Sequence, residues 1–168
     1  LPVFHHLWFL WYLCLLVVLF AFYAMAVDAR QWRGPPRWLI ATPVRYLWLL
    51  PLTMVPQALM GLLPGASEFG PDTAIGFIPA PHILAYYSVF FGFGVLYFDC
   101  DDSDNQLGRW WWITLPITLC AVLPLALDFA TGELGLREEL VPSSYFRLFS
   151  VMLQAMFAWG MTFGLIGL

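Results

Sequence analysis

The residues of this sequence best suited to move protons are its three histidines, each of which borders an apolar segment. His5 and His6 precede an uncharged run over residues 7–26, and His82 begins a second apolar run. A histidine titrates close to neutral pH and can act as a general acid or base. We therefore predict His6 and His5 as catalytic residues. The alternative is that both are ordinary residues of a membrane interface.

Aromatic residues accompany the histidines. Trp8 follows His6 closely, and Tyr86 lies four residues after His82, which puts His82 and Tyr86 on one face of a helix. We predict that His82, Trp8 and Tyr86 bind a substrate. The alternative is an aromatic belt at the membrane surface, where Trp and Tyr are enriched.

Arginine supplies all seven basic side chains, and four arginines follow the first apolar run. These are Arg30, Arg33, Arg37 and Arg45. A guanidinium group binds phosphate through two parallel hydrogen bonds, so we predict that the four hold a phosphorylated donor. For Arg45, a structural ion pair with the acidic cluster at residues 99–104 is the alternative.

The composition is that of a membrane protein. The chain is 61% hydrophobic and 11% charged, and its mean hydropathy is +0.77. Soluble domains contain about 25% charged residues, so a soluble globular fold is excluded. The net charge of −4 also argues against a nucleic-acid partner, which requires basic side chains for the phosphates.

Five apolar segments divide the chain, and about 20 residues of helix match a hydrocarbon core of roughly 30 Å. The segments cover residues 7–26, 39–63, 82–98, 110–129 and 145–168. We predict an all-α, polytopic integral membrane helix bundle with about five transmembrane helices. Pro43, Pro51 and Pro56 predict a bent or broken second helix, which either lines a cavity or has packing consequences alone.

Small residues predict close helix packing at two places. Gly160 and Gly164 have the small-xxx-small spacing that lets two helices approach, and Gly92 with Gly94 gives the third helix a similar thin face.

The arginine distribution predicts the orientation. Cytoplasmic loops carry excess arginine, and residues 27–38 hold three arginines whereas residues 64–81 hold none. We therefore expect the arginine loop inside. The histidine pair, residues 64–81 and residues 130–144 then face outward, and residues 99–109 face inward, although that last loop is acidic.

The sequence contains no motif typical of a hydrolase or an NTPase. The sequence lacks a Ser-His-Asp order, a P-loop, a dinucleotide fingerprint and the common metal spacings. It gives no reason to expect a metal or a bound redox cofactor.

Three motifs in order resemble the membrane acyltransferase 3 family, in particular its periplasmic glucan succinyltransferase branch. The first is His6-Leu7-Trp8-Phe9-Leu10, and the second is the aromatic and glycine-rich stretch from Tyr86 to Gly94. The third is Ala158-Trp159 followed by the residues from Gly164 to Leu168.

The resemblance implies a function. Members of the family take an acyl group from cytoplasmic acyl-CoA and place it on a hydroxyl acceptor, often a carbohydrate, at the outer face of the bacterial inner membrane. The family has about ten membrane helices and a presumed catalytic histidine on the first. Residues 1–168 then correspond to a single partial domain that lacks the N-terminal helices, is truncated at its C-terminal end, and is inactive alone.

Two other classes suit the same sequence. A transporter or channel module would use the broken second helix and the intramembrane arginine, and would move a substrate without a covalent product. A non-catalytic membrane scaffold is the third reading.

Overall fold

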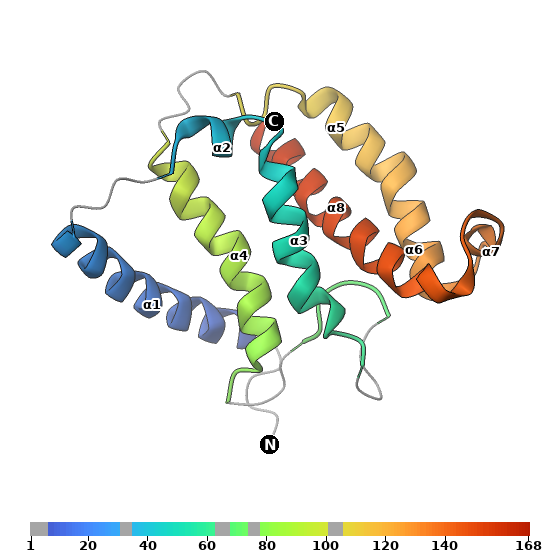
Figure 1. Ribbon diagram of the computed structural model, residues 1–168, viewed down its shortest axis with the longest axis horizontal. Helices are drawn as coiled ribbons and strands as arrows, with labels where there is room; N and C mark the ends of the chain where they lie inside the picture. Colours follow the sequence, from blue (N-terminus) through green and yellow to red (C-terminus); the bar gives the residue numbers. More distant parts are fainter. Residues whose placement is uncertain (1–6, 31–34, 63–67, 74–77, 101–105) are drawn as a thin grey trace.

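Helices form all of the regular structure in the part of the chain that is described (Figure 1). The computed structural model describes residues 7–30, 35–62, 68–73, 78–100 and 106–168. The helices are α1 (Trp8–Arg30), α2 (Arg37–Ala41), α3 (Arg45–Ala58), α4 (Pro81–Phe98), α5 (Trp111–Ile117), α6 (Leu123–Thr131), α7 (Leu136–Leu140) and α8 (Phe146–Ile166). A π-helical turn, η1 (Thr118–Val122), joins α5 to α6, and a 3-10 turn, η2 (Ser143–Tyr145), leads into α8.

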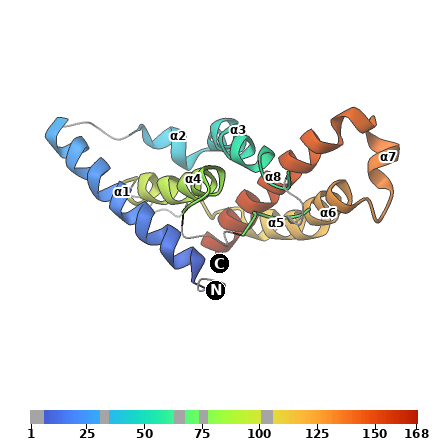
Figure 2. The ribbon, with the colours of Figure 1, turned by 90° about the horizontal axis from the view of Figure 1, so that it is seen from below.

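Four long elements lie side by side in the order α4, α3, α8 and the continuous α5–α6 unit (Figures 1 and 2). Helix α8 is central, because it packs on α3 on one side and on α5, η1 and α6 on the other. Helix α1 meets α4 near its own N-terminal half and then leans away from the rest of the bundle.

Four of the described helices are long and apolar enough to cross a membrane: α1, α4, the α5–α6 unit, and α8 with the turn before it. Their apolar surfaces are largely exposed, as expected for helices that face lipid tails. Together with α3 in their midst, they make the chain a multi-pass, all-α membrane protein, as its sequence predicts.

The second predicted span, residues 39–63, is broken. Helix α2 ends at Ala41, Pro43 lies in the turn that follows, and α3 begins at Arg45. The 14 residues of α3 span about 21 Å, which is less than the hydrocarbon core. Pro51 and Pro56 lie inside α3 without interrupting it, so the predicted break is confirmed and falls at the first proline alone.

Side chains satisfy the carbonyl groups that this break releases. The Trp38 carbonyl keeps its helical partner, the Thr42 N–H at 3.3 Å, and also accepts from the Thr42 hydroxyl at 2.6 Å. The indole of Trp48 donates to the Leu39 carbonyl at 3.2 Å, and Arg45 Nη1 donates to the Ala41 carbonyl at 2.9 Å. Lipid offers no hydrogen-bond donors, so a broken helix persists in a membrane only with such local partners.

Glycines let α8 approach the α5–α6 unit. A Cβ atom added at Gly160 would overlap the Thr118 side chain, and one at Gly164 would lie 2.5 Å from Leu115 Cδ2. The predicted close contact at these two glycines is confirmed. By contrast, a Cβ added at Gly92 or Gly94 meets nothing within 4 Å, so the close packing predicted for this face of α4 is wrong.

The π-helical turn lies where α8 crosses. Leu123 N–H donates to the carbonyl of Thr118, five residues earlier. Pro124, in the first turn of α6, has no N–H to donate to an earlier carbonyl.

Candidate functional site

Three of the predicted site residues fall outside the described part of the chain. These are His5, His6 and Arg33. The remaining predictions concern Trp8, His82 and Tyr86 at one end of the bundle and Arg30, Arg37 and Arg45 at the other.

Trp8 and Tyr86 belong to one group of packed side chains, which we call the aromatic cluster. Its buried members are Tyr12, Met60, Ile83 and Tyr86, and Trp8 and Tyr87 pack against them. The Trp8 ring lies 5.7 Å from that of Tyr87, which lies 5.5 Å from that of Tyr86. The sequence predicted that these positions share a site, and the fold brings Trp8 and Tyr86 together through Tyr87.

A hydrogen bond fixes α1 to the start of α4. The backbone N–H of Ala80 donates to the Tyr12 hydroxyl oxygen at 2.8 Å. His82 follows in the first turn of α4, where it is half-buried and one helical turn from Tyr86. In the chain His82 directly precedes Ile83, a buried member of the aromatic cluster.

A polar cavity of about 260 Å³ opens next to this cluster, and we call it the polar pocket. Its walls come from the end of α3, the end of α6, the first half of α8 and the segment 68–70. Its lining residues are Gln57, Met60, Gly61, Glu68, Gly70, Phe129, Ala130, Arg147, Ser150, Val151 and Gln154. Met60 belongs to both regions, so the polar pocket and the aromatic cluster share a wall.

A hydrogen-bond network orders the pocket. Gly70 N–H donates to Gln154 Oε1 at 2.9 Å, and Gln57 Nε2 donates to the same oxygen at 3.0 Å. Gln154 Nε2 in turn donates to Ser150 Oγ at 3.0 Å. Gln57, Ser150 and Gln154 are all buried. Gln57 and Gln154 hold segment 68–70 against the bundle, and Ser150 in turn binds Gln154.

Arg147 closes one side of the pocket. Its Nη2 donates to the carbonyl oxygens of Ala58 at 2.7 Å and Met60 at 3.1 Å. Those carbonyls end α3, where a positive charge is favourable because helix carbonyls lack partners there.

The predicted donor arginines are not equivalent. Arg30 and Arg37 are exposed at the end of α1 and the start of α2. Arg45 is buried, with its guanidinium carbon 4.4 Å from the ring centre of Phe163 in addition to its bond to Ala41. Arg45 therefore stabilises the break between α2 and α3. It lies at the same end of the bundle as Arg30 and Arg37, which we call the arginine-bearing end.

Asp128 has a structural role. It is 1% exposed, and its two carboxylate oxygens accept the backbone N–H groups of Leu134 and Arg137, both at 2.7 Å. The carboxylate therefore caps the turn that leads into α7.

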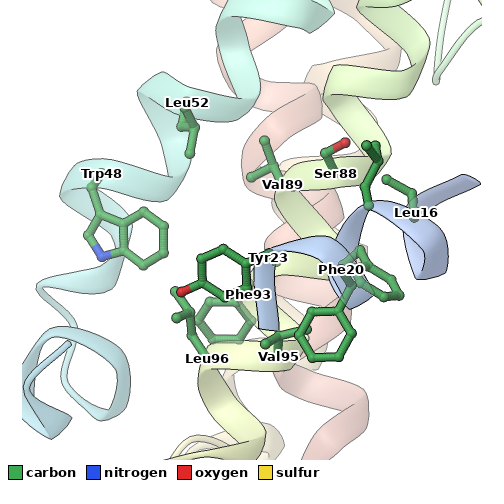
Figure 3. A pocket seen from close by; sticks show the side chains of 13 residues that line it. Leu16, Phe20, Tyr23, Trp48, Leu52, Ser88, Val89, Phe93, Val95 and Leu96 are labelled. Atoms are coloured by element: carbon green, nitrogen blue, oxygen red, sulfur yellow. The ribbon is translucent and has the colours of Figure 1, made fainter. Parts of the chain in front are cut away.

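An apolar slot of about 360 Å³ lies between the arginine-bearing end and the aromatic cluster (Figure 3). Phe20 and Tyr23 of α1 face Phe93 and Val95 of α4, and Trp48 of α3 lies on the far side. The hydroxyl of Ser88, which also lines the slot, is turned back onto the Leu84 carbonyl at 2.7 Å. The slot therefore suits an apolar chain rather than a polar group.

Sequence reasoning missed the polar pocket. Gln57 and Gln154 stand 97 residues apart, each inside an apolar segment. A polar side chain at such a place is costly unless it has a partner, and that was the available signal. The pairing of the two amides could not be read from it.

No family model, curated protein or solved structure matches this chain. The fold and the composition define the chain as a multi-pass membrane protein. Among its described residues, no three or more metal-ligating side chains lie together.

Proposed function

We propose that this chain is part of a multi-pass membrane acyltransferase of the bacterial inner membrane. The reaction transfers an acyl group from cytoplasmic acyl-CoA to a hydroxyl acceptor, a carbohydrate, at the outer face. The acceptor hydroxyl loses a proton to a base and attacks the thioester carbonyl, directly or after an acyl relay, and CoA leaves as the thiol.

One observation carries the proposal: groups suited to donor and acceptor lie at opposite ends of one bundle. Arg30 and Arg37 are exposed at one end, while His82, the aromatic cluster and the polar pocket lie at the other. The apolar slot lies between them, and an acyl chain is the part of the donor that such a slot accommodates.

The test is covalent transfer in reconstituted vesicles that contain the full-length protein. Isotope-labelled acyl-CoA is supplied on the arginine side, and the label is followed onto a carbohydrate on the other side. Arg37→Ala should weaken acyl-CoA binding and reduce its salt dependence, because a guanidinium–phosphate contact is lost. Arg109→Ala, at the same end, removes an equal charge and serves as the control.

If Arg33→Ala and Arg37→Ala leave the affinity for acyl-CoA and its salt dependence unchanged, these arginines do not form the donor site. For the acceptor side, wild-type product in His6→Ala at normal protein abundance would make that motif structural.

A transporter module is the second candidate, and the break between α2 and α3 is the observation that favours it. Transporters place interrupted helices at their substrate sites. The same vesicles separate the two functions, since a transporter gives flux of unmodified substrate and no acylated product.

A further inference from the structure

We propose that the polar pocket is a binding site for one ring of a neutral sugar, with Gln57 and Ser150 as direct contacts and Gln154 as a positioning residue. This inference rests on the proposed function for its role as the acceptor site. The binding chemistry itself stands on the geometry of the pocket.

The orientation of both amides follows from one backbone group. Gly70 N–H can only donate, so the Gln154 atom that it meets must be the oxygen Oε1. The Gln57 atom on the same oxygen must then be a donor, Nε2, and Gln154 Nε2 must donate to Ser150. The network therefore has a single direction.

With the hydrogen bonds directed in this way, one acceptor, on Gln57, and one donor, on Ser150, remain available to a ligand. The hydrogen bonds of Gln57 to described residues use Nε2, so Oε1 remains to accept from a ligand hydroxyl. Ser150 Oγ accepts from Gln154, so the Ser150 hydroxyl proton can be donated. A hydroxyl group, which both donates and accepts, is complementary to this pair.

Charge and size narrow the ligand class. One acidic and one basic residue, Glu68 and Arg147, line the pocket, so neither an anion nor a cation is favoured. The volume of about 260 Å³ is near the lower end of ligand pockets, which run from roughly 300 to 1,000 Å³. It admits a small polar ring, and Phe129 supplies an apolar wall for the face of that ring.

Gln154 holds the pocket in shape. It fills its own hydrogen bonds with protein groups and keeps segment 68–70 in place. We therefore expect its loss to open the wall formed by Gly70, whereas loss of Gln57 or Ser150 removes a ligand contact directly.

The test measures sugar binding with no acyl donor present. The full-length protein is purified in a detergent without a sugar headgroup, and saturation-transfer NMR records binding of methyl β-glucoside and cellobiose. Gln57→Met and Ser150→Ala should each weaken binding about five- to tenfold, as expected for one lost hydrogen bond. Ser144→Ala, an exposed serine before α8, is the matched control and should bind like wild type.

A second measurement guards against misfolding. Thermal unfolding of each variant shows whether the bundle is intact, and Ser150→Ala is the smaller change if Gln57→Met lowers stability. Wild-type sugar binding in both folded variants overturns the assignment, and so does the absence of sugar binding by the wild-type protein.

The outcomes separate this inference from the proposed function. Sugar binding that depends on Gln57, without any acylated product, leaves the pocket standing and removes the acyltransferase. Acyl transfer that is unchanged in Gln57→Met, with unchanged sugar binding, removes the pocket and leaves the enzyme.

Discussion

The contact of α8 with the α5–α6 unit and the contact of α1 with α4 differ in kind. Within the most apolar stretch of each helix, 44% of the residues of α8 are buried, against 11% in α1, although α1 is the more apolar of the two. Lipid tails are as apolar as leucine, so hydrophobicity does not drive helices together in a membrane. Close van der Waals packing drives helices together instead, and it requires small residues on one helix where side chains of the other helix approach.

Glycine shows the same contrast at single positions. Gly160 and Gly164 face Thr118 and Leu115 so closely that no side chain would fit, whereas Gly92 and Gly94 face open space along α4. The glycines of α8 therefore make a helix contact, whereas Gly92 of α4 borders the apolar slot.

The largest expected effect concerns the other face of α8, where this tightly packed helix meets α3 and α4. Trp159 is 0% exposed, stacks on Phe90 at 4.3 Å, and donates from its indole to Thr53 Oγ1 at 2.9 Å. Trp159→Ala should lower the free energy of unfolding in detergent by about 3 kcal/mol, mainly through the cavity that it leaves. Trp112→Ala, on the exposed face of α5, should change it by less than about 0.5 kcal/mol.

A smaller change tests the glycine contrast directly. Gly160→Ala should lower the free energy of unfolding by about 1–3 kcal/mol, because the new methyl group overlaps the β-branched Thr118 side chain. Gly92→Ala gains the same helix propensity with open space around it and should be neutral or slightly stabilising. Equal effects of the two substitutions in a denaturant titration would abolish the distinction between the two helix contacts.

The smallest effect concerns the loose side. Tyr12→Phe removes the acceptor of the Ala80 N–H and should cost about 1 kcal/mol of unfolding free energy. Tyr23→Phe, later on the same helix and exposed, is the matched control. A larger loss than that of Gly160→Ala would mean that α1 is held as firmly as α8.

Much of the fold was predictable because spans in a membrane are set by length and hydropathy. The segments predicted at residues 82–98, 110–129 and 145–168 agree closely with α4, the α5–α6 unit and α8. The break at Pro43 was also predicted, but the continuity of α3 through Pro51 and Pro56 was not, since it depends on neighbouring helices.

The candidate site was predictable only in part. Trp8 and Tyr86, both predicted to bind a substrate, lie in one aromatic cluster, and their role stays a prediction. Gln57, Ser150 and Gln154 were missed, since lone polar residues in apolar segments do not reveal which partner they meet. The roles predicted for all of the site residues stay predictions, and His5, His6 and Arg33 lie outside the described residues.

The sequence by itself determined that this protein is helical, lies in a membrane and crosses it several times. Backbone groups without water must pair within each helix, and apolar length then fixes the spans. Only the tertiary structure decided which helices touch and which amides converge. Those choices join residues about a hundred positions apart, such as Thr53 with Trp159 and Gln57 with Gln154. They depend on shape and hydrogen-bond direction, which no local pattern records.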